Sequence, residues 1–142
     1  MQAMPFEIFE HTADVGVHVR APRLEELFGE AARAVVSLIV ENPDSIMERE
    51  QWTIRLEAED VEGLFVDWLR ELIYRFETEH LLLRRCSVRL SDGNRRLEAE
   101  CRGEHADWTR HLPAYELKAA TYHQLRVAET PAGWEADVIF DV

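Results

Sequence analysis

Cysteine is scarce in this sequence, which has two among 142 residues and no Cys-x-x-Cys spacing. This scarcity argues against a disulfide scaffold and against a zinc ribbon. Long apolar runs are also absent, since no stretch approaches the roughly 20 residues needed to span a bilayer. The first five residues lack the basic and apolar regions of a secretory signal. We therefore expect a cytoplasmic protein that is not associated with a membrane.

Basic residues are few compared with acidic ones. The sequence has 16 Lys and Arg against 28 Asp and Glu, which gives a net charge of −12 at pH 7. Such a chain repels phosphates, so direct, high-affinity nucleic-acid binding is not expected, and an acidic surface suits a basic protein partner. Hydrophobic residues still make up 46% of the chain, which predicts a folded protein. Because no linker or low-complexity segment divides it, we expect a single compact domain over residues 1–142.

Two segments repeat apolar residues with the period of an α-helix. The first covers about residues 24–39 and the second about residues 61–76. Asp60 directly precedes the second segment and is positioned to cap its N-terminus. Both apolar stripes are expected to face a protein core.

The other segments alternate apolar and polar residues and are predicted to be strands. They cover residues 5–9, 15–20, 52–58, 81–90, 97–101, 116–127 and 134–141. The order of strands and helices predicts an α+β fold, in which two amphipathic helices pack on one or two mostly antiparallel sheets.

A first hairpin is expected around a two-residue turn at Gly93-Asn94. Matching the apolar residues sets its register. The predicted pairs are Leu90 with Leu97, Val88 with Ala99, and Cys86 with Cys101. The cysteines then become cross-strand neighbours, which we expect to remain reduced, buried thiols in a cytosolic protein.

A second hairpin is expected around a loop at residues 130–133. The predicted pairs are Val127 with Ala136, Leu125 with Val138, His123 with Phe140, and Tyr122 with Asp141. Sliding the register by one pleat puts Asp141 opposite Ala120 instead. Either register puts Asp141 on one sheet face with Lys118 and Tyr122, with Lys118 about 7 to 13 Å away along the strand.

The last predicted strand ends in two neighbouring carboxylates, the side chain of Asp141 and the α-carboxylate of Val142. A third carboxylate, Asp14, follows His11 in a short connection between two apolar runs. Oxygen ligands of this kind suit calcium or magnesium better than zinc. The alternative is a set of solvated surface acids.

Four blocks of sequence together resemble the archease family. They are His11-Thr-Ala-Asp-Val-Gly16, Trp68-Leu-Arg-Glu-Leu-Ile-Tyr-Arg-Phe76, Leu117-Lys-Ala-Ala-Thr-Tyr-His123 and Val138-Ile-Phe-Asp-Val142. The blocks occur in the family's order, the last one at the end of the sequence, so the resemblance extends over nearly the whole chain.

The resemblance implies a non-enzymatic accessory protein of tRNA processing. Its partner would be the RNA-splicing ligase, which joins a 3′-phosphate or 2′,3′-cyclic-phosphate RNA end to a 5′-hydroxyl end in tRNA splicing or RNA repair. The accessory protein would promote the GTP-dependent guanylylation of that ligase and allow multiple turnovers. By the same resemblance, Asp14, Asp141 and Val142 correspond to a metal site, often occupied by calcium, and Lys118 corresponds to a functional lysine.

Three further residues are candidates for supporting roles near this site. His11 would cap or orient the connection that contains Asp14, and Tyr122 shares its predicted face with Asp141. His123 is either a half-buried, hydrogen-bonded histidine or a supporting residue of the site.

Other functions remain open at this stage. A metal-dependent hydrolase could use Asp14 and Asp141, but the sequence has no evident general base with a fixed partner and no phosphate-loop spacing. A chaperone or specificity modulator of another RNA-processing enzyme, such as a tRNA methyltransferase, is the stronger alternative. The sequence does not decide whether the two aspartates bind their own cation or act on a metal of the partner.

Overall fold

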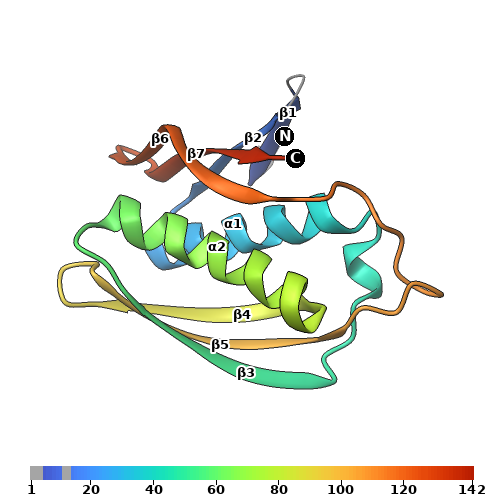
Figure 1. Cartoon of the computed structure of the whole chain (residues 1–142). Coiled ribbons are helices and arrows are strands. Elements are labelled where there is room, and N and C mark those ends of the chain that lie inside the picture. Colours follow the sequence, from blue (N-terminus) through green and yellow to red (C-terminus); the bar gives the residue numbers. More distant parts are fainter. Residues whose placement is uncertain (1–4, 11–13) are drawn as a thin grey trace.

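The computed structural model describes residues 5–10 and 14–142, and it has three layers, with two helices between two antiparallel sheets (Figure 1). One sheet has the strand order β1-β2-β7-β6 and the other the order β3-β5-β4. The strands are β1 (Phe6–Glu10), β2 (Asp14–Ala21), β3 (Glu50–Glu57), β4 (Leu81–Ser91), β5 (Arg96–His105), β6 (Ala119–Thr130) and β7 (Gly133–Asp141). The helices are α1 (Leu24–Ile39) and α2 (Val61–Glu79), and a short 3-10 turn, η1 (Pro43–Ser45), follows α1. The predicted α+β class is confirmed.

Both helices bury more than one stripe because each contacts the two sheets. Helix α1 spans the predicted residues, and its buried side chains include Ala32, Ala34 and Val36 in addition to the predicted stripe. Helix α2 begins where predicted, and the Asp60 carboxylate accepts a hydrogen bond from the Gly63 amide at 2.8 Å. It continues three residues beyond the predicted end, because its polar last turn stays helical up to a left-handed cap.

That cap is His80, at φ 56°, whose amide donates to carbonyls of the last turn. Two contacts join the helices in the middle layer. The Trp68 indole donates to the Phe28 carbonyl at 2.9 Å, and the rings of Phe28 and Phe65 meet edge to face at 5.2 Å. Within the described residues, neither helix is long and apolar enough to cross a membrane.

The β4–β5 hairpin has the predicted register, including the pair Cys86 and Cys101. Its loop is longer than the predicted two-residue turn, because residues 92–95 are unpaired and three of them adopt positive φ. Both cysteines are free thiols. Burial raises the pKa of Cys86 to about 11 and that of Cys101 to about 12, so both stay protonated at neutral pH.

The β6–β7 hairpin follows the predicted register only near its turn. Val127 pairs with Ala136, but the register shifts between Thr121 and Arg126, so Asp141 lies opposite Ala119. The predicted partners of Leu125, His123 and Tyr122 are therefore wrong. The extra residues form an irregular segment at 122–125, which includes Gln124 at φ 53°. Strand β6 is at the edge of its sheet, where such a bulge interrupts pairing on only one side.

Candidate functional site

Asp14 and Asp141 lie directly opposite each other, at the end of the β2–β7 ladder. Side chains alternate along β2, and Val15, Val17 and Val19 are buried against the helices. Asp14 therefore projects from the other, outer face of the sheet, and Asp141 shares this face because directly paired residues do so. Their Cβ atoms are about 5 Å apart in such a pair. The structure thus brings together two carboxylates from opposite ends of the sequence.

The Asp14 carboxylate has an oxygen that the described part of the chain leaves unsatisfied. Its Oδ1 atom is buried and has no hydrogen-bond partner among residues 5–10 and 14–142. A buried acceptor without a donor costs about 1–3 kcal/mol, and like charges that are directly opposite across a ladder repel. A cation between Asp14 and Asp141 would remove both penalties.

Lys118 lies beside this pair. Its backbone amide donates to the Asp141 carbonyl at 2.9 Å, so Lys118 is closer to Asp141 than the predicted 7 to 13 Å. The predicted shared face is wrong, because Asp141 pairs with Ala119 and Lys118 precedes the regular strand. Lys118 is the only lysine in the sequence. Its side chain is exposed and makes no ion pair with any residue that the structure describes.

The donor set fits a hard cation, although the side chains alone complete only part of a site. Among residues 5–10 and 14–142, no group of three or more His, Cys, Asp or Glu side chains converges. Asp14 and Asp141 provide carboxylate oxygens, and the neighbouring Val142 packs partly buried against the core. Calcium takes six to eight oxygen ligands, so backbone, water or partner oxygens would supply the remainder.

The structure describes two of the three candidate supporting residues. Tyr122 and His123 are exposed in the irregular segment of β6, so the predicted half-buried environment of His123 is wrong. The Tyr122 ring instead packs under the guanidinium of Arg70 on α2, at 5.2 Å from its centroid. His11 lies outside the described residues.

Gly16 has a role that the sequence analysis missed. It pairs with Phe9 of β1, whose ring covers it on the outer face, and a Cβ atom at this position would overlap that ring. The side chain at residue 16 must therefore be absent for the Phe9 ring to lie across β2. A glycine inside an alternating strand pattern was the available signal.

A second missed feature is a chain of charged groups on the same outer face. Nδ1 of His18 is 2.6 Å from Oδ1 of Asp137, and Arg126 donates to both Asp137 and Glu135. Burial alone would raise the pKa of Asp137, but the hydrogen bonds from His18 and Arg126 outweigh it and hold this pKa below its usual range. The chain crosses strands β2, β7 and β6, and it braces the sheet that presents Asp14 and Asp141.

Comparison with known proteins assigns the chain to a family. The sequence matches the Archease protein family (MTH1598/TM1083) over residues 6–142. It is 34% identical to the protein archease of Methanosarcina barkeri over 145 residues, which cover 99% of this chain and 98% of the relative. It is 35% identical to the protein archease of Pyrococcus furiosus over 140 residues, covering 96% and 98% respectively.

Solved structures agree in fold. The solution structure of Methanobacterium thermoautotrophicum protein 1598 matches with a TM-score of 0.80 and 27% identity, over 97% of this chain and 99% of that one. The crystal structure of a Thermotoga maritima protein, described as an archease and possible chaperone, has a TM-score of 0.63 and 23% identity, with both chains fully covered. The resemblance inferred from four sequence blocks is confirmed, and the chain belongs to the archease family.

Proposed function

We propose that this chain is a non-enzymatic activator of the RNA-splicing ligase that joins 3′-phosphate or 2′,3′-cyclic-phosphate RNA ends to 5′-hydroxyl ends. It would act in the cytoplasm by promoting the GTP-dependent guanylylation of the ligase, in tRNA splicing or RNA repair. The observation that supports this proposal is that Asp14, Asp141 and Lys118 meet at one end of the β1-β2-β7-β6 sheet. Membership of the archease family supports the same assignment.

We further propose that Asp14, Asp141 and the α-carboxylate of Val142 hold a divalent cation, calcium or alternatively magnesium. The unsatisfied Oδ1 of Asp14 and its opposed partner Asp141 support this assignment. A bound cation would neutralise the carboxylates and order this end of the sheet. In the alternative role, the same oxygens would approach a metal in the partner's active site. Calorimetric titration of the isolated protein with calcium distinguishes the two, because only the first role requires binding without the partner.

The test of this function is guanylylation of the RNA ligase from the same organism. The ligase is incubated with radiolabelled GTP and manganese, with and without substoichiometric amounts of this chain. We expect the chain to accelerate formation of the guanylylated ligase and to act more than once per molecule. A ligase that is active by itself and unaffected by the chain would contradict the proposal.

Lys118 provides a second prediction. Because its unpaired ammonium is a compact cation beside Asp141, we expect it to contact a phosphate or a carboxylate of the partner. Lys118→Ala should lower activation by about 30-fold, the equivalent of about 2 kcal/mol for a desolvated charge contact. Lys118→Arg should restore only part of it, since a guanidinium differs in shape.

The control for net charge is Arg102→Ala, which removes an equal charge from an exposed position on the other sheet. Guanylylation rates of the three variants are compared at equal concentration. Equal losses in Lys118→Ala and Arg102→Ala would assign the effect to overall charge and not to this site.

A second candidate function is that of a chaperone or specificity modulator of another RNA-processing enzyme, such as a tRNA methyltransferase. The description of the Thermotoga relative as a possible chaperone favours keeping this candidate. A chaperone should suppress aggregation of its partner without needing Lys118. An activator should change the partner's rate and should require Lys118.

A further inference from the structure

Strand β4 leaves one edge of its sheet unpaired. Among the strands that the structure describes, it pairs only with β5, because the strand order is β3-β5-β4. The Leu90 amide donates to the Glu25 carboxylate of α1 at 2.8 Å, so it points away from β5. Alternate residues of a strand present their backbone groups to the same side. Val88 and Cys86 therefore also direct N–H and C=O groups outward, and no side chain within the described residues is bonded to their amides.

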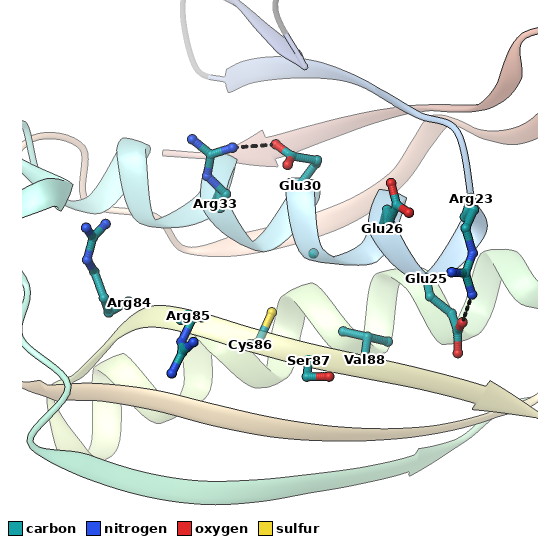
Figure 2. A pocket seen from close by; sticks show the side chains of 11 residues that line it. Arg23, Glu25, Glu26, Glu30, Arg33, Arg84, Arg85, Cys86, Ser87 and Val88 are labelled. Atoms are coloured by element: carbon teal, nitrogen blue, oxygen red, sulfur yellow. Dashed lines mark hydrogen bonds and ion pairs between the residues drawn. The ribbon is translucent and has the colours of Figure 1, made fainter.

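A groove of about 490 Å³ runs along this edge, between α1 and β4 (Figure 2). Cys86 and Val88 contribute its apolar part, and both are partly buried. Gly29 of α1 also lines the groove, and a Cβ atom placed there meets nothing within 4 Å. The outward backbone groups of β4 therefore face a space that extends to Gly29 of α1, where the helix carries no side chain.

The charges around the groove differ between its two ends. Arg33, Arg84 and Arg85 lie at one end, where Glu30 is paired with Arg33, while Glu25 and Glu26 lie at the other, together with Arg23, which is paired with Glu25 (Figure 2). Each arginine at this end has an acidic partner, and the pairs of Arg84 with Asp44 and of Arg85 with Glu48 are exposed. Arg84, for example, is 3.4 Å from Asp44, whose side chain is 97% exposed. Such pairs contribute little and are readily exchanged for a new partner.

A second copy of the chain is a poor occupant. Strand β4 contains Arg84, Arg85 and Arg89 but no acidic residue. Antiparallel pairing of two β4 strands about Ser87 would put Arg85 of each copy opposite Arg89 of the other. Like charges opposite each other are destabilising, so the edge disfavours self-association and favours a strand with complementary charge.

We propose that the groove binds an extended segment of a partner protein, which adds to β4 as a fourth, antiparallel strand. Antiparallel addition sets the direction of the segment. The N-terminal end of the segment lies near Glu25 and Glu26 and carries a basic residue. Its C-terminal end lies near Arg84 and Arg85 and carries an acidic residue. Backbone hydrogen bonds to Cys86 and Val88 provide the attachment, as in other cases of strand addition. This surface is separate from Asp14 and Asp141, which lie on the other sheet, and the proposal goes beyond ligase activation.

The test uses two peptides of identical composition and opposite charge order. One is acetyl-Lys-Val-Thr-Val-Glu-amide and the other is acetyl-Glu-Val-Thr-Val-Lys-amide, each titrated into the full chain labelled with ¹⁵N. We expect the first to shift the amides of residues 86–88 and 29–33 with a Kd of about 1 mM, and the second to bind about tenfold more weakly. Equal binding of both peptides would overturn the proposal. So would the absence of any shift of these amides at 10 mM peptide, which is on the order of ten times the expected Kd.

Gly29 provides a matched pair of variants. Gly29→Gln fills the groove, whereas Gly29→Ala adds a single methyl group, and both improve the helix propensity of α1. We expect Gly29→Gln to abolish peptide binding and Gly29→Ala to retain it, with ligase guanylylation unchanged in both. Unaltered peptide binding by Gly29→Gln contradicts the proposal. Concentration-dependent dimerisation in sedimentation, lost in Gly29→Gln, would assign the groove to a second copy instead.

Discussion

Replacing Asp14 by asparagine is expected to reduce ligase guanylylation to the rate measured without this chain, while the fold remains intact. The reason is that asparagine keeps the size of the side chain but removes one of two directly opposed carboxylates. The same loss is expected for Asp14→Ala, Asp141→Asn and Asp141→Ala. Guanylylation rates and circular dichroism of each variant provide the measurement. Full activation by all of them would exclude this site.

The stability of the same variants tests the proposed cation. Without calcium, Asp14→Asn should raise the free energy of unfolding by about 0.5 kcal/mol, because a repulsive cross-strand pair is removed. With free calcium at about 100 times Kd, the wild type should gain about 2.7 kcal/mol and the variant should not. Chemical denaturation with calcium or with chelator measures both quantities.

Glu135→Gln serves as a control variant, because Glu135 lies on β7 and on the same outer face as Asp141. Glu135 pairs with Arg126, well away from Asp141 along β7. Its replacement should lower stability slightly and leave both activation and the response to calcium unchanged. Calcium stabilisation of Asp14→Asn equal to that of the wild type would show that the cation binds elsewhere.

Replacing Glu104 by glutamine is expected to cause the largest loss of stability, about 3–5 kcal/mol at pH 7, because it breaks a buried ion pair. Glu104 is 3% exposed, and its carboxylate accepts two hydrogen bonds from Arg110 and one from the Met47 amide. The fully buried His111 donates to it from Nε2 at 3.1 Å, while its Nδ1 accepts from the Asp107 amide. Glutamine cannot accept all these bonds and leaves Arg110 with only its longer ion pair to Asp107, at 4.0 Å, among the residues that the structure describes.

The effect of Glu104→Gln should depend on pH in a defined direction. Hydrogen bonds from Arg110 lower the pKa of Glu104 from 4.5 to about 2, against the opposing effect of burial. A lowered native-state pKa stabilises the fold above pH 4.5, and this stabilisation is lost as pH falls from 4.5 towards 2.

The measurement is the difference in unfolding free energy between the wild type and Glu104→Gln. This difference should be constant from pH 7 to 5 and shrink below pH 4.5. Glu100→Gln, on the same strand but exposed, should show only a small difference at every pH. A difference for Glu104→Gln that does not change with pH would contradict the assignment of the lowered pKa.

Local pattern was sufficient to predict the helices and one hairpin. Helix α1 has the predicted bounds, and α2 begins directly after Asp60, because apolar periodicity and capping are local properties. The β4–β5 register followed from matching apolar residues across a short loop. None of these features depends on distant parts of the chain.

The β6–β7 register could not be obtained in this way. Apolar matching assumes a regular ladder, whereas β6 has an irregular segment at 122–125 that changes the partner of Asp141. Strand β5 also continues to His105, beyond its predicted end at residue 101. In this extension Glu104 accepts from the Met47 amide after η1, and Arg110, beyond it, donates to the Ser45 carbonyl within η1, contacts that sequence periodicity does not reveal.

The sequence by itself determined the α+β class and the family, because these depend on local patterns and motifs, and it predicted Asp14, Lys118 and Asp141 as candidate functional residues. Only the tertiary structure decided that Asp14 and Asp141 are direct partners. Strands β2 and β7 are distant in the chain, and their pairing follows from packing the apolar faces of both on helix α1. The tertiary structure also decided that β4 is an edge strand. The order of strands in a sheet depends on how the two helices pack against its faces.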